Sequence, residues 1–239
     1  MKGLLGSPLE FYIAPNWEHR VRHHSLFLNQ ECCTYSLLGS RFFSSPWSRE
    51  IHPVLERIIQ SLQQIIPLFT TLPNYSRLNS ISNEHDYVVL LAHSLLSLGR
   101  DQPIDPFQDT LRRAIQVYMA IRMWKFEGMP CAEKTVDTLR CSLARSFTLV
   151  KNKSPDLLFW ILFMGCLGAK QQACYMWFWE RLEKTATELQ LLDWDGALSI
   201  LEGFLFVRWP TDEQGRALWN IIAQRQRPDL NSYTGSNVI

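Results

Sequence analysis

The densest cluster of side chains that could bind a metal ion lies near the start of the chain, where His19, His23 and His24 precede Cys32 and Cys33. On a helix, His19 and His23 stand four residues apart and would share one face, as a metal site requires. Adjacent cysteines seldom ligate one tetrahedral ion, and no second pair of ligands follows. A solvated basic stretch is therefore the better interpretation, and we expect no metal-binding residue.

Motifs for nucleophilic, metal-dependent or phosphate chemistry are missing from the sequence. It contains no Gly-x-Ser-x-Gly elbow, no His-Glu-x-x-His pair and no glycine-rich phosphate loop. His85, Asp86 and His93 fall on one predicted helix, where polar residues at its start and one helix histidine are the better interpretation than a general base. We expect no enzyme, no catalytic residue and no cofactor.

A group of basic residues on another predicted helix could contact phosphate. It comprises Arg112, Arg113, Arg122 and Lys125. Acidic neighbours such as Asp109 and Glu127 neutralise it, so a solvated helix face is the better interpretation. The nine tryptophans and thirteen phenylalanines favour an aromatic core, with an apolar pocket among them as the alternative.

Composition limits the classes of protein further. The 239 residues include 46% hydrophobic and 20% charged side chains, with 24 Lys+Arg against 23 Asp+Glu. The hydrophobic fraction is too high for a disordered chain. The net charge is too close to zero for a surface that binds nucleic acid electrostatically. The longest apolar run, Leu157–Ala169, is shorter than the ~20 residues of a membrane span. The first eight residues do not resemble a secretory signal, so we expect the six cysteines to be reduced thiols.

Periodicity and helix-end signals predict an all-α fold, a single irregular domain of about seven to eight helices. Residues 1–45 are expected to be irregular, residues 46–225 to form the helical domain and residues 226–239 to be a flexible tail. The expected helices cover 54–69, 82–98, 106–126, 132–150, 157–169, 173–189, 194–207 and 218–223. The expected end signals are Ser82 or Asn83, Gly99, Asp105 with a capping-box Gln108, Ser154, Asp193, and Thr211 with Gln214.

The helix over Leu157–Ala169 has no polar face, which predicts that protein surrounds it at the centre of the core. Gly165, Gly168 and Ala169 would let neighbouring helices approach it closely. No internal repeat is present, which argues against a regular helical solenoid.

From about Leu90 to Ile222 the sequence resembles the fungal-specific transcription factor domain, the helical regulatory region that follows a zinc binuclear cluster in many fungal regulators. The residues that carry the resemblance are Leu157–Ala169, then Trp177-Phe178, then Leu191-Leu192-Asp193-Trp194, and then Ile200–Phe206. Phe206 stands where the family usually has a tryptophan, and the arginine often found before the Trp-Phe pair is absent.

The resemblance implies a regulatory domain of a nuclear transcription regulator, which responds to an effector or to partners in the transcription machinery. The family's zinc cluster needs six closely spaced cysteines, whereas the six here are scattered, so we expect no direct DNA contact from this chain. It is either a shortened version of such a regulator or a relative without the cluster. The effector, the direction of regulation and homodimerisation are left open.

Two alternatives remain. The first is a helical scaffold whose exposed faces bind another protein. The second is an all-α enzyme such as a terpene cyclase, which would need an aspartate-rich metal motif. The nearest run, Asp193-Trp194-Asp195, stands at a helix start and is better interpreted as a cap.

Overall fold

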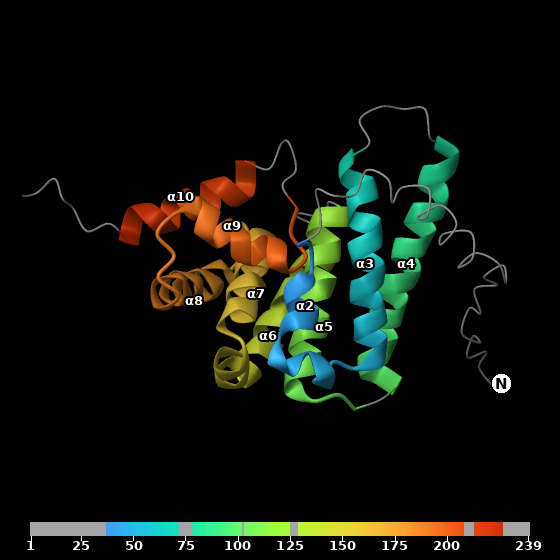
Figure 1. Cartoon of the computed structure of the whole chain (residues 1–239), viewed down its shortest axis with the longest axis horizontal. Coiled ribbons are helices and arrows are strands. Elements are labelled where there is room, and N and C mark those ends of the chain that lie inside the picture. Colours follow the sequence, from blue (N-terminus) through green and yellow to red (C-terminus); the bar gives the residue numbers. More distant parts are fainter. Residues whose placement is uncertain (1–36, 72–77, 102, 125–128, 208–212, 227–239) are drawn as a thin grey trace, which may run out of the picture.

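The computed structural model describes residues 37–71, 78–101, 103–124, 129–207 and 213–226. Within these ranges the chain forms nine α-helices and no strand, which confirms the all-α expectation (Figure 1). They are α2 (Ser40–Ser44), α3 (Pro53–Thr71), α4 (Leu78–Asp101), α5 (Pro106–Tyr118), α6 (Pro130–Lys153), α7 (Pro155–Gly168), α8 (Tyr175–Glu188), α9 (Trp194–Gly203) and α10 (Glu213–Gln226). A 3-10 helix, η2 (Pro46–Glu50), follows α2, and a π-helix, η3 (Met119–Met123), follows α5. None of the described helices combines the length and hydropathy needed to cross a membrane.

Helix α7 is the centre of the core, as its sequence predicts. Every residue from Leu157 to Gly168 is buried, and the helix packs against α5, α6, α8, α9 and α10. Two glycines permit this close packing, because a Cβ at Gly165 would collide with the ring of Phe178 on α8 and one at Gly168 would collide with Val136 on α6. A helix with no polar face is thus enclosed by protein on all sides.

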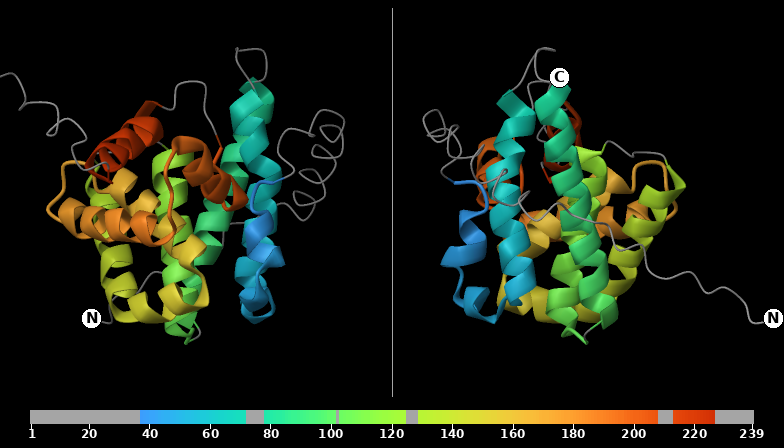
Figure 2. Two further views of the ribbon diagram at one scale, coloured as in Figure 1. Left: turned by 60° about the vertical axis from the view of Figure 1, so that its left-hand side comes forward. Right: turned by 90° about the vertical axis from the view of Figure 1, so that its right-hand side faces the viewer.

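Helices α3 and α4 form an antiparallel pair at one end of the molecule, and the right-hand view of Figure 2 shows them side by side. The apolar positions of α3 recur at helical spacing and are buried. They are Leu55, Ile58, Ile59, Leu62, Ile65 and Ile66.

Three of the predicted N-caps are confirmed. The side chains of Asp105, Ser154 and Asp193 each accept a hydrogen bond from a backbone N–H two or three residues further on, at 2.9, 3.3 and 2.8 Å. Each cap satisfies an N–H group that has no partner inside the helix. The expected signal at Thr211 lies outside the described residues.

The predicted ends of α4 are wrong. The helix begins at Leu78, before the expected caps at Ser82 or Asn83, and continues through Gly99 to Asp101. Gly99 has a different role, because a Cβ added there would stand 2.7 Å from Cζ of Arg112. The glycine gives the guanidinium group room to cross α4, so it does not mark the end of the helix.

At the start of α5, only one of the two hydrogen bonds of the predicted capping box forms. Asp105 caps the helix, but the side chain of Gln108 does not return to the N-cap backbone. Gln108 turns away from its own helix: its Nε2 donates to the carbonyl of Glu50 at 2.5 Å, and its Oε1 accepts from the backbone N–H of His52 at 3.1 Å. This buried amide fastens the chain between η2 and α3 to α5, a tertiary role that local sequence does not reveal.

The chain around residue 40 was expected to be irregular, but it contains α2 and a buried aromatic side chain. Phe42 is fully buried and packs edge-on against Trp47, Trp160 and Phe204, with ring centroids 4.9–6.3 Å apart. The short helix is held in place by the core, because five residues are too few for a stable helix alone.

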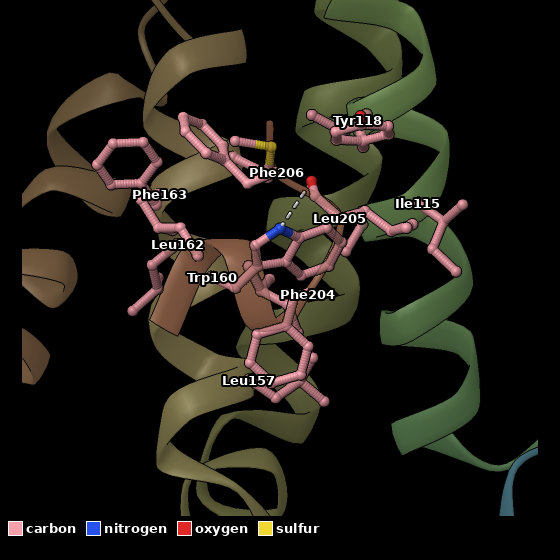
Figure 3. Close-up of a cluster of buried hydrophobic side chains, with 14 of the residues drawn as sticks. Ile115, Tyr118, Leu157, Trp160, Leu162, Phe163, Phe204, Leu205 and Phe206 are labelled. Atoms are coloured by element: carbon pink, nitrogen blue, oxygen red, sulfur yellow. Dashed lines mark hydrogen bonds between the residues drawn. The ribbon is translucent and has the colours of Figure 1, made fainter. Parts of the chain in front are cut away.

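Helix α9 ends at Gly203 and does not reach Val207 as expected. The four residues that follow are buried, and other segments donate to the carbonyl groups of three of them, Phe204, Leu205 and Val207. Trp160 Nε1 donates to the carbonyl of Leu205 at 3.3 Å, as Figure 3 shows, and the backbone N–H of Gly39 donates to that of Phe204 at 2.8 Å. These tertiary hydrogen bonds replace those of a continued helix.

The helix expected over 106–126 is α-helical only to Tyr118 and continues as η3. Arg122 of η3 lies over the ring of Phe206 at 4.8 Å and donates from Nη2 to the carbonyl of Val207 at 3.0 Å. The π-helix thus places an arginine against the segment that follows α9.

Candidate functional site: the groove between α6 and α8

The histidine and cysteine cluster of residues 19–33 lies outside the described residues. In the part of the chain that is described, no group of three or more metal-binding side chains comes together. His93 is exposed on α4. The described cysteines, Cys131, Cys141, Cys166 and Cys174, are free thiols.

The expected basic cluster is only partly described: Arg112 and Arg113 lie on α5 and Arg122 on η3, whereas Lys125 and Glu127 lie outside the described residues. The expectation of a solvated face is wrong for Arg112. Arg112 is 5% exposed, and its Nη2 binds Asp109 Oδ1 at 2.7 Å while Nη1 donates to the carbonyl of Leu95 at 2.9 Å. Arg113 Nε binds the other carboxylate oxygen of Asp109 at 2.8 Å. The expectation that Asp109 neutralises these arginines is confirmed, but it does so inside the molecule.

The carboxyl group of Asp109 also accepts a hydrogen bond from Ser142 on α6 at 2.7 Å. Burial by itself would raise the pKa of this carboxyl group. The hydrogen bonds from Arg113, Arg112 and Ser142 outweigh that effect and lower the pKa from 3.8 to about 2. A carboxylate held by three donors has no free role as an acid or base, so we interpret this network as structural.

The described surface is hollowed between α6 and α8. This groove has a volume of about 440 Å³. Its lining comes from one face of each helix: Ala144, Phe147 and Lys151 of α6, and Trp177, Glu180, Arg181, Lys184, Thr185 and Glu188 of α8. Residues three, four and seven apart share a helix face, which explains why these positions converge.

Arg181 lies over the aromatic floor of the groove. Its Cζ is 4.1 Å from the ring centroid of Trp177 and 5.9 Å from that of Phe147. Its Nη1 donates to the carbonyl of Trp177 at 3.0 Å, within the same helix. The two rings and this hydrogen bond fix the orientation of the guanidinium group.

The charges of the groove are unevenly paired. Lys151 Nζ binds the carboxylate of Glu188 at 2.8 Å across the two helices. Arg181 and Lys184 make no ion pair with any described residue, and Glu180 is the only other carboxylate in the lining. The lining therefore carries a net charge of +1, from three cations and two carboxylates.

This groove was not among the predicted sites, although a pocket among the aromatic side chains was the alternative to a purely aromatic core. Trp177 was expected to be core, and Trp160, Trp179 and Trp219 are indeed buried, but Trp177 is only half-buried. The available signal was the spacing of Trp177, Arg181 and Lys184 along one helix face. What the spacing could not reveal is that α6 presents Phe147 opposite to it.

Asp193 does not form part of an aspartate-rich metal motif. Its side chain caps α9, as expected from its position at a helix start.

Comparison with protein-family models, with curated proteins and with solved structures finds no match for this chain.

Proposed function

We propose that this chain is a helical regulatory domain of the fungal transcription-regulator type, which responds to an effector or partner and acts in the nucleus. In this function the chain catalyses no reaction and touches no DNA itself. It changes the state of the transcription machinery through the molecules that it binds.

One observation carries the proposal: the separate segments on which the resemblance rests pack together. The ring of Phe163 in α7 lies 6.3 Å from that of Trp194 and 5.8 Å from that of Phe206, between centroids. Phe178, of the Trp-Phe pair, packs against Gly165. Segments spread over fifty residues thus form one structural unit around α7, which supports a shared fold as the origin of the pattern.

Regulation needs two states of the domain with different affinity for a ligand. The groove between α6 and α8 is suited to this task because it joins two helices that both pack against α7. A ligand that bridges α6 and α8 would favour one arrangement of the helices around the core.

The test is a reporter assay in a fungal host. The chain is fused to a heterologous DNA-binding module, and transcription from a promoter with that module's site is compared with the module alone. We expect the fusion to raise or lower transcription and the unfused chain to have no effect. Unchanged transcription from a fusion that is nuclear and folded would contradict the proposal.

A second function, a helical interaction scaffold, is favoured by one specific observation. Val89 and Leu96 are 51% and 63% exposed and stand seven residues apart on α4, on one helix face. Exposed apolar side chains that line up in this way suit contact with another protein. A scaffold unconnected with transcription would leave the reporter at the level of the DNA-binding module alone.

A further inference from the structure

We propose that the groove between α6 and α8 binds a small aromatic carboxylic acid, with Arg181 as the residue that holds its carboxylate. This inference rests on the proposed function only in naming the acid as an effector. The binding itself follows from the geometry of the groove.

The guanidinium group of Arg181 is prepared for a carboxylate. Because it lies on Trp177 and donates from Nη1 to the Trp177 carbonyl, its orientation is fixed before a ligand arrives. Its Nε and Nη2 have no hydrogen-bond partner among the described residues. A planar guanidinium group with donors to spare matches the two oxygens of a carboxylate.

The rest of the groove selects an aromatic body. Trp177 comes from α8 and Phe147 from α6, so each helix contributes an aromatic ring to the groove, beside the guanidinium group of Arg181 that lies over both rings. Aromatic groups stack on such surfaces at their edges and faces. The volume of about 440 Å³ falls within the range of small-molecule sites, roughly 300–1,000 Å³.

The charges favour a ligand with one negative charge. Lys151 is neutralised by Glu188, which leaves Arg181 and Lys184 as the cations without an ion pair in the lining. A monocarboxylate would complement them. A polyanion such as a phosphate ester would exceed the net charge of +1 in the lining, and the carboxylate of Glu180 would repel it more strongly than a monoanion.

The experiment measures binding of naphthalene-2-carboxylate to the full chain by isothermal titration calorimetry, with the neutral naphthalene-2-carboxamide as the matched probe. We expect the carboxylate to bind the wild-type protein at least about tenfold more tightly than the amide, because hydrogen bonds between charged partners are the stronger ones. Arg181→Gln should remove this preference. Arg181→Lys should keep part of it, because lysine supplies the positive charge but not the paired N–H donors of the guanidinium group. Lys184→Gln should weaken binding of the carboxylate to a smaller extent.

The matched control is Arg145→Gln, which removes an exposed cation of α6 that does not line the groove. It should bind the carboxylate as the wild type does. The inference is overturned if the wild type fails to bind the carboxylate at roughly 1 mM, or if it prefers the carboxylate no more than the amide. Equal loss in the Arg181→Gln and Arg145→Gln variants would also overturn it.

The outcomes separate this inference from the proposed function. Binding is measured on purified protein and the reporter in cells, so a chain that regulates transcription but ignores the acid refutes the inference alone. A chain that binds the acid but leaves the reporter unchanged refutes the proposed function and retains the binding site.

Discussion

Asp109 holds together the polar contacts between α5 and α6. It binds both arginines of its own helix and accepts from Ser142 on the facing helix. Ser142 and Ser146 also lie within hydrogen-bond distance of Thr110, at 3.1 and 2.7 Å. Buried polar groups that satisfy one another in this way fix the register of two helices.

Asp109→Asn should destabilise the protein by about 2–4 kcal/mol, because it leaves the buried guanidinium of Arg112 without its counter-charge. The measurement is urea unfolding at pH 7 of the variant and the wild type. The control is Asp137→Asn, since Asp137 pairs with Arg140 at the surface and its side chain is 56% exposed. We expect the control to change stability by less than about 1 kcal/mol. Equal stability of Asp109→Asn and wild type would contradict this account.

The same carboxylate predicts a pH dependence. Because the folded-state pKa of Asp109 is about 2, below its ordinary value of 3.8, its contribution to stability is complete above pH 4. That contribution is lost as the pH falls from about 4 towards 2. The stability difference between wild type and Asp109→Asn should therefore shrink across this window, as measured by urea unfolding at each pH. A difference that stays constant down to pH 2 would show that the charge is not its source.

At the scale of elements, side chains from one segment anchor the backbone of another. Gln108 of α5 binds the chain between η2 and α3, and Trp160 of α7 binds the segment after α9. These side chains hold the segment before α3 and the segment after α9 against the core. Neither segment is part of a long helix, so neither is held by a long run of helical hydrogen bonds of its own.

Gln108→Leu should destabilise the protein by about 1–3 kcal/mol, because the carbonyl of Glu50 and the N–H of His52 lose their hydrogen bonds to this buried amide while the side-chain volume is kept. The control is Gln60→Leu, an exposed position on α3, where the change should stay within about 0.5 kcal/mol. Thermal unfolding of both variants checks the difference. Indistinguishable melting temperatures for the two would mean that the Gln108 amide does not fasten the chain to α5.

Features decided by neighbouring residues could be predicted from the sequence. Asp105, Ser154 and Asp193 cap helices because their side chains reach N–H groups within three residues, and α7 is central because it has no polar face. Gly99 was assigned wrongly because its role depends on Arg112, a residue of another helix. The groove depends on how α7 places α6 beside α8, so the pattern of one helix alone could not reveal it.

The whole molecule is organised around α7, and its stability should follow that arrangement. Backbone amides in α7 should be the slowest to exchange with deuterated water, since every residue from Leu157 to Gly168 is buried and opening them requires global unfolding. Helix α10 packs at the edge and should exchange faster. Mass spectrometry of peptides from both helices checks this order, and equal protection of the two would contradict a core centred on α7.

The central claim is that this chain regulates transcription through what it binds. The most direct test measures reporter transcription from the tethered chain in three forms: wild type, Arg181→Gln and Arg145→Gln. The account predicts that the wild type and Arg145→Gln change transcription alike, whereas Arg181→Gln, folded and equally abundant, gives a different output because its groove no longer holds a carboxylate. If all three forms leave transcription at the level of the DNA-binding module alone, the claim is contradicted.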